Sequence, residues 1–221
     1  RYDHGAAVAV GDMWQPQVGP GGGAFTRDDH HLNVGRHVTS FADLLKRVHD
    51  EVPPIQRLRF VTSFPRDFSD EALAVMAQSP RMCRYLHVPA QSGSDRMLKA
   101  MNRGYTVEQY RAFIERARTM MPDVMIASDF IVGFPCETDE DFQQTVDLLR
   151  WARFKNSFIF KYSPRPGTVA YDKLPDDVPE ETKRQRNVDL LAAQSEISQE
   201  IHQAMVGQTV EVLVEGVSQK A

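Results

Sequence analysis

Four short polar segments, each following a predicted strand, carry the side chains of this chain that could do chemistry. Their hydroxyl, amide, imidazole, carboxylate and guanidinium groups can bind an alcohol, an amino acid or an anion. These groups belong to Thr62, Ser63 and Arg66, to His87, Gln91, Ser92 and Ser94, to Asp129 and Glu137, and to Tyr162, Ser163, Arg165 and Thr168. No nucleophile, base and orienting group stand together in sequence, so the residue types indicate a binding site and do not define a reaction.

Taken singly, each group also has a structural explanation. Arg165 is the best anion-binding candidate, because a planar guanidinium matches a carboxylate or phosphate. Asp129 could bind a charged or hydroxyl group, or could pair with Arg165 or Arg66. Gln91 and Ser92 suit a ribose or an amino-acid group, although capping of the turn explains them equally well. His87 lies in an apolar strand, where a buried histidine with a structural partner is at least as good an interpretation as a catalytic one.

The two cysteines, Cys83 and Cys136, are far apart and form no metal-binding motif. We therefore predict no metal site within this chain. So few cysteines favour a reducing, cytoplasmic compartment. Cys136 is better explained as a small residue in a tight turn than as a reactive thiol, because no histidine or lysine neighbours it in sequence.

A repeated strand, loop and helix pattern would position the polar segments. Strands are predicted over 58–62, 85–88, 125–132 and 158–162, and helices over 39–52, 69–78, 95–102, 106–120, 139–152 and 179–205. This alternation predicts an α/β fold, in which a parallel sheet is covered by helices and curls toward a barrel or stays open. Because parallel strands end at one edge of the sheet, the four polar segments should converge there.

Composition and charge add few restrictions on function. The 221 residues are 42% hydrophobic and 25% charged with a net charge of −4, as in an ordinary globular protein without a global basic signature for nucleic acid. No apolar run is long enough to span a bilayer, so we expect no membrane association. The chain does not begin with methionine, and we interpret it as an excerpt of a longer protein.

Three regions are expected along the chain. Residues 1–37 are rich in glycine and are predicted to be an irregular surface insertion. Residues 38–205 contain the repeated strand and helix pattern and end in a long polar helix. Residues 206–221 begin with an alternating stretch, Thr209 to Val214, which predicts the first strand of a small, truncated β domain.

Several stretches resemble the methylthiotransferase branch of the radical S-adenosylmethionine enzymes. Residues 128–138 match its S-D-F-I-V-G-F-P-G-E-T motif, with Cys136 at the usual glycine, and residues 162–168 match Y-S-x-R-x-G-T. Further similar stretches are 86–95, 101–106, 176–181 and 62–68, the last with Phe64 where histidine is common. Their joint occurrence in this order is highly specific.

The resemblance implies a fold and an activity. The family fold is a partial (β/α) barrel followed by an RNA-holding TRAM β domain, whose first strand residues 208–216 resemble. The Gln-Ser-Gly-Ser and Ser-Asp-Phe sequences favour the MiaB type, which methylthiolates N6-isopentenyladenosine beside the tRNA anticodon. The alternatives are an enzyme that acts on threonylcarbamoyladenosine in tRNA or on a ribosomal protein, and a non-catalytic RNA-binding module.

The resemblance also implies cofactors and partners. The complete enzyme would cleave S-adenosylmethionine at one [4Fe–4S] cluster and supply sulfur at a second, with an electron donor and a sulfur source as further partners. The cysteines that hold both clusters are absent from this sequence, so we expect the excerpt alone to be inactive. We expect a monomer that binds the anticodon stem-loop. The S-adenosylmethionine side would be formed by Gln91, Ser92, Asp129, Ile131, Val132, Ser163 and Arg165.

Overall fold

The structure, a computed structural model, describes residues 8–10, 32–34, 37–61, 65, 68–212, 214 and 216. Its centre is a parallel three-stranded sheet in the order β5 (Tyr85–His87), β6 (Met125–Val132) and β7 (Asn156–Lys161). A second parallel pair consists of β1 (Val8–Val10) and β4 (Leu58–Phe60). β4 adjoins the segment that leads into β5, because the amide of Cys83 donates to the Leu58 carbonyl at 2.9 Å.

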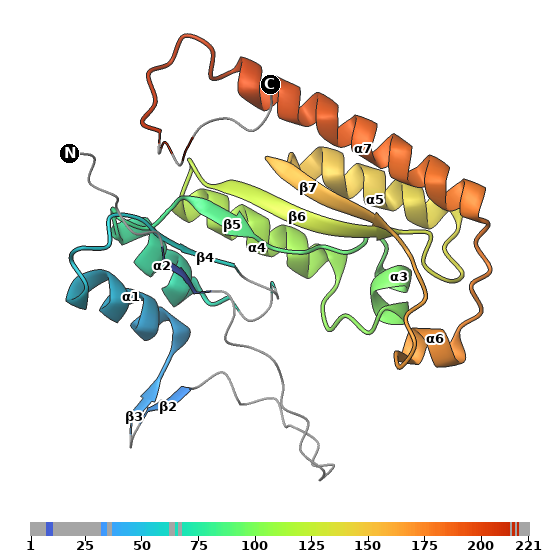
Figure 1. Cartoon of the computed structure of the whole chain (residues 1–221), viewed down its shortest axis with the longest axis horizontal. Coiled ribbons are helices and arrows are strands. Elements are labelled where there is room, and N and C mark those ends of the chain that lie inside the picture. The colour runs from blue at the N-terminus through green and yellow to red at the C-terminus, as the bar shows by residue number, and fades with distance from the viewer. Residues whose placement is uncertain are drawn as a thin grey trace.

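Helices follow the strands in the order that the sequence predicts (Figure 1). They are α1 (Phe41–Glu51), α2 (Asp70–Gln78), α3 (Asp95–Ala100), α4 (Val107–Met120), α5 (Asp139–Ala152), α6 (Val169–Lys173) and α7 (Glu180–Gln203). Ser40, Thr106 and Thr138 begin α1, α4 and α5 with capping boxes, in which the side chains of the cap and of the third helical residue satisfy each other's backbone amides.

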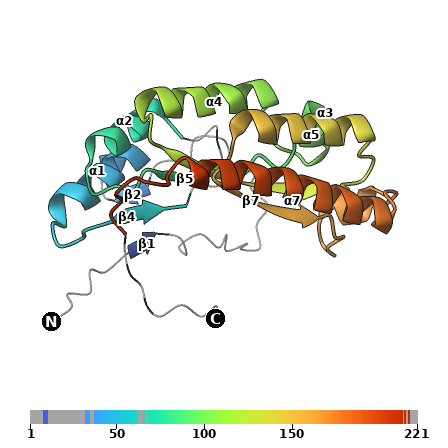
Figure 2. The same ribbon diagram turned by 90° about the horizontal axis from the view of Figure 1, so that it is seen from above.

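The core lies between the sheet and the helices. Alternate residues of β6, which are Ile126, Phe130 and Val132, are at most 2% exposed and pack with residues of α4 and α5. Figure 2 shows α4 and α5 on one side of the strands, with α7 beside β7. Among the residues that the structure describes, no helix covers the opposite side of β5, β6 and β7.

Helix α7 packs along the edge strand of the sheet. Leu190, Ala193 and Ile197 are buried on its inner side. Asn187 donates to the carbonyl of Ile159 in β7, and Gln194 donates to the carbonyl of Phe154 just before that strand, both at 2.9 Å. The helix therefore runs antiparallel to β7 and returns the chain to the edge of the sheet where the strands begin.

The α/β fold with a parallel sheet is confirmed, and three details differ from the sequence predictions. The region 1–37 was predicted to be irregular, but it includes β1 and one strand of the antiparallel hairpin formed by β2 (Leu32–Val34) and β3 (His37–Thr39). Residues 208–212 are exposed and irregular instead of forming the predicted first strand of a β domain. The short helix α6, capped by Thr168, was not predicted. None of the described helices is long and apolar enough to cross a bilayer.

Candidate functional site

The open side of the sheet carries one group of partly exposed side chains, which we call the open face. It consists of His87, Asp129, Ile131, Phe158 and Phe160. Asp129 stands opposite Phe158 in the parallel register, and Ile131 stands opposite Phe160. The two phenylalanines are 51% and 54% exposed, which is unusual for aromatic side chains on a sheet. Because strand side chains alternate between faces, all five point away from the core.

His87 and Asp129 form the polar centre of the open face. The Nε2 atom of His87 lies 2.9 Å from Oδ1 of Asp129, and the two side chains are 17% and 25% exposed. The His87 ring stacks against Phe158 with 5.9 Å between ring centroids and 11° between planes. A carboxylate and an imidazole beside exposed aromatic rings can bind a flat ligand that also carries hydrogen-bonding groups. Among the described residues, the partner of Asp129 is His87, whereas Arg66, one of the two arginines that the sequence offered as a partner, lies outside the described residues.

Gln91 lies in the turn that brings the chain from β5 alongside the end of β6. Its amide donates to the carbonyl of Asp129 at 2.8 Å, and its carbonyl accepts from the amide of Ile131 at 3.0 Å. Its φ of 68° is in the left-handed region, which costs a residue with a side chain about 1 kcal/mol. The backbone pairing with β6 holds Gln91 there, beside two residues of the open face.

Ser92 and Val132 lie on the helix side instead. The hydroxyl of Ser92 is 3.2 Å from that of Thr145 in α5 and accepts from the amide of Ser94 at 3.1 Å. Ser92 is 2% exposed, and the side chain of Val132 is fully buried in the core. The structure therefore brings Asp129 and Ile131 together on the open face, and it separates the side chains of Ser92 and Val132 from them.

Ser163 and Arg165 belong to the loop between β7 and α6. The hydroxyl of Thr168 donates to the carbonyl of Arg165 at 2.8 Å and closes a turn. Arg165 itself is exposed. Thr62, Ser63 and Arg66, the polar group predicted at the end of the first strand, lie outside the described residues.

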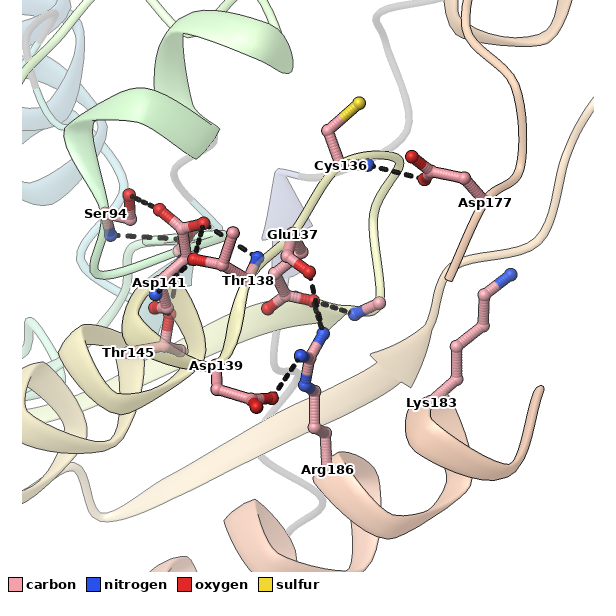
Figure 3. A network of polar contacts seen from close by, with 12 residues as sticks. Ser94, Cys136, Glu137, Thr138, Asp139, Asp141, Thr145, Asp177, Lys183 and Arg186 are labelled. Atoms are coloured by element: carbon pink, nitrogen blue, oxygen red, sulfur yellow. Dashed lines mark hydrogen bonds and ion pairs between the residues drawn. The ribbon is translucent and has the colours of Figure 1, made fainter. Parts of the chain in front are cut away.

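The turn after β6 is held by charged residues of α7, to which the sequence analysis assigned no role. The Glu137 carboxylate accepts from the amide of Gly133 and from Arg186, whose Nη1 lies 3.3 Å from Oε2 (Figure 3). The side chains of Glu137 and Arg186 are 2% and 7% exposed. Burial raises the pKa of Glu137, and the amide of Gly133 and the Arg186 guanidinium oppose that rise.

Cys136 has a φ of 64°, a conformation that glycine adopts without strain. This explains why the resembling motif usually has glycine at this position. The amide of Cys136 donates to Asp177 at 2.7 Å, which fixes the backbone of the turn. The interaction of the thiol with Asp177 raises its pKa, and burial adds to the rise. The Cys136 side chain is exposed, but the raised pKa of its thiol makes it less reactive.

The site is an open surface without a metal centre in the described part of the chain. No group of three or more histidine, cysteine, aspartate or glutamate residues is placed to hold a metal ion there. A separate shallow hollow on α7, lined by Ser195, Gln199 and His202 among others, contains none of the open-face residues.

A family profile and similar curated proteins both relate this chain to known enzymes. The profile of the radical SAM superfamily matches residues 31–149. Three similar curated proteins are named tRNA-2-methylthio-N(6)-dimethylallyladenosine synthase. The protein of Rhodopirellula baltica is 53% identical to this chain over 83% of the chain's residues. The protein of Syntrophotalea carbinolica is 49% identical over 82% of this chain, and that of Neisseria meningitidis is 47% identical over 83%. The chain spans only 38%, 41% and 41% of the lengths of those relatives.

A solved structure shares the fold. Coproporphyrinogen III oxidase (HemN) from Escherichia coli, described as a radical SAM enzyme, superposes with a TM-score of 0.58 over 71% of this chain and 37% of its own. Its sequence identity is 17%, so the similarity concerns the fold alone.

Proposed function

Since the chain belongs to the radical SAM superfamily, we propose that it is part of an enzyme that methylthiolates N6-isopentenyladenosine beside the anticodon of tRNA. The observation that supports this proposal is the sequence similarity to synthases of that name. About half of the aligned residues are identical, and the alignments cover most of this chain. The proposed partners are S-adenosylmethionine, the tRNA anticodon stem-loop, an electron donor and a sulfur source. We propose that the complete protein acts as a monomer in the cytoplasm.

The open face fits S-adenosylmethionine by its chemistry. The Asp129 carboxylate can accept from ribose hydroxyls or from the ammonium of the methionyl group, and His87 holds that carboxylate in place at 2.9 Å. The exposed ring of Phe158 offers a surface on which a purine can stack. Ile131 adds an apolar wall beside Asp129. We also propose Gln91, Ser163 and Arg165 as contacts, and any contribution of Ser92 or Val132 would come from the backbone.

The [4Fe–4S] clusters do not fit the residues of this chain. A cluster site needs at least three cysteines, and the sequence contains only Cys83 and Cys136. When bound, S-adenosylmethionine supplies the radical for the reaction. The role of the residues present here is to bind and orient that molecule and the base on the open face.

Nucleoside analysis of tRNA tests the proposed reaction. In a strain that lacks the complete gene, we expect 2-methylthio-N6-isopentenyladenosine to disappear and N6-isopentenyladenosine to accumulate. The complete gene supplied on a plasmid should restore the methylthio group. Unchanged methylthio-isopentenyladenosine in the deletion strain would overturn the proposal, and loss of a methylthiolated threonylcarbamoyladenosine would redirect it to that base.

Asp129→Asn in the complete protein is expected to weaken S-adenosylmethionine binding about tenfold, which corresponds to about 1.4 kcal/mol. The substitution keeps the size of the side chain and removes its charge, so an ammonium or hydroxyl donor loses a charge-assisted bond. Isothermal titration with S-adenosylmethionine measures the change. Asp147→Asn, on the exposed side of α5, is the matched control. Equal affinity of Asp129→Asn and the control would show that Asp129 does not contact the ligand.

A further inference from the structure

The first turns of α7 contact the turn after β6 at several points. Arg186 binds the side chain and the carbonyl of Glu137, with its Nη1 3.2 Å from that carbonyl oxygen. Its Nη2 lies 2.7 Å from Oδ1 of Asp139. Just before α7, Asp177 accepts from the amide of Cys136. Figure 3 shows these groups arranged around residues 133–139.

Lys183 closes the same turn by steric contact. Its side chain is 3% exposed, pairs with Asp176 and lies over the ring of Tyr162 at 5.4 Å. A Cβ atom added to Gly133 would overlap Cγ of Lys183 and lie 3.1 Å from its Cβ. The backbone of the turn and the stem of Lys183 are therefore in direct contact, and movement of one requires movement of the other.

Burying these charges needs an explanation beyond stability. Breaking a buried ion pair is strongly destabilising, yet the intact pair often stabilises no more than apolar residues of the same size would. Here the pair connects α7 to a turn whose Gly133 and Cys136 both adopt left-handed conformations, with φ of 71° and 64°. Because Cys136 is not glycine, its left-handed conformation is strained and persists only while the surrounding contacts impose it.

We propose that Arg186, supported by Lys183, is a positioning residue that compensates the buried Glu137 carboxylate and thereby fixes the turn at 133–137. This turn also fixes the end of β6, where Ile131 and Asp129 face the ligand. The consequence for S-adenosylmethionine rests on the proposed function, whereas the effect on the turn does not.

Arg186→Gln in the complete protein tests this role. We expect the amides of Gly133, Phe134, Cys136 and Glu137 to exchange with solvent about tenfold faster, because the buried carboxylate loses its counter-charge. We expect the Kd for S-adenosylmethionine to rise by a similar factor. Arg184→Gln is the matched control, because Arg184 pairs with the exposed Glu181 on the outer side of the same helix. The control should leave both measurements unchanged.

The pH dependence separates this role from a general loss of stability. The charged groups around Glu137 are Arg186 of α7, Asp139 and Asp141 of α5 and Arg96 of α3. Without Arg186, the pKa of Glu137 should rise further, so the variant should be impaired most at high pH and should recover as the pH falls and Glu137 becomes protonated.

A double variant keeps the test decisive if Arg186→Gln does not fold. Glu137→Gln with Arg186→Gln removes both charges, so slow amide exchange and S-adenosylmethionine binding should return close to those of the wild type. A double variant as impaired as the single one, or wild-type exchange in Arg186→Gln, would overturn the positioning role. If the wild-type protein lacks the proposed tRNA activity while Arg186→Gln still shows faster amide exchange, only the proposed function is contradicted.

Discussion

Gly93→Ala is expected to lower the free energy of unfolding by about 3 kcal/mol, at the upper end of the cost of overpacking. Gly93 lies against the backbone of α5. A Cβ atom at this position would overlap the carbonyl group of Gln144 and lie 2.6 Å from Cα of Thr145. These are backbone atoms, so no side chain can turn aside. The whole helix would have to move away from the segment that links β5 to α3.

Chemical denaturation of this chain, followed by circular dichroism, measures the loss. Gly167→Ala is the matched control, because nothing lies within 4 Å of the added atom there. Gly167 has a φ of 84°, so its variant should show only the conformational cost of about 1 kcal/mol. Equal losses in the two variants would show that the approach of Gly93 to α5 does not limit stability.

Asp141→Asn is expected to destabilise the chain by about 3 kcal/mol, because hydrogen bonds to a buried charged group are strong. The Asp141 side chain is 6% exposed and accepts from Ser94 at 2.6 Å and from the amide and hydroxyl of Thr138 at 2.8 and 2.7 Å. Arg96 provides its counter-charge. Oδ1 accepts from Ser94 and Oδ2 accepts from Thr138, so the NH2 group of an amide must face the donors of one of these two residues.

The effect of Asp141 should depend on pH. Burial alone would raise the pKa of Asp141, but the hydrogen bonds from Arg96, Ser94 and Thr138 outweigh it and hold the pKa below its usual 3.8. A carboxyl group with a lowered pKa contributes its full stability above the usual value and loses it as the pH falls toward the lowered one. The difference between wild type and Asp141→Asn should therefore be constant near neutral pH and shrink in acid.

Thermal unfolding across that pH range checks the effect, with Glu140→Gln as the control in the same helical turn. Glu140 is exposed, so its variant should cost little. A loss in Asp141→Asn that persists undiminished well below pH 3.8 would contradict the role of the ionised carboxylate.

The pattern of strands and helices was predictable because apolar periodicity and caps act locally. Thr106 and Thr138 form the capping boxes that begin α4 and α5, and both helices begin where the sequence predicts. The parallel order also accounts for the position of Gln91 beside Asp129 and Ile131, whereas the polar group predicted at the end of the first strand lies outside the described residues. The open face was harder to predict, because β6 is apolar on both sides and its sequence does not show which alternate residues face the helices. Ile131 and Val132 were therefore assigned to one wall although they lie on opposite sides.

Pairing between distant residues could not be predicted from spacing. His87 and Asp129 are 42 positions apart and meet only because β5 and β6 are neighbours in the sheet. Lys183 and Arg186 are a similar case. Charged residues near the start of a polar helix are usually solvated, and their burial depends on Asp176 and Glu137, which other segments supply.

The direction and length of α7 determine where the chain goes after it leaves the sheet. With 24 residues, this helix is about 36 Å long. Its first residues pack against the turn after β6, and its last turns lie near Lys155, just before β7 (Figure 1). The helix thus acts as a fixed spacer. The residues after 204 begin a full helix length away from Asp177 and from the turn that Asp177 contacts. Under the proposed function, a following segment that contacts the same RNA as the open face would have to reach back across the strands, or bind the RNA well away from the modified base.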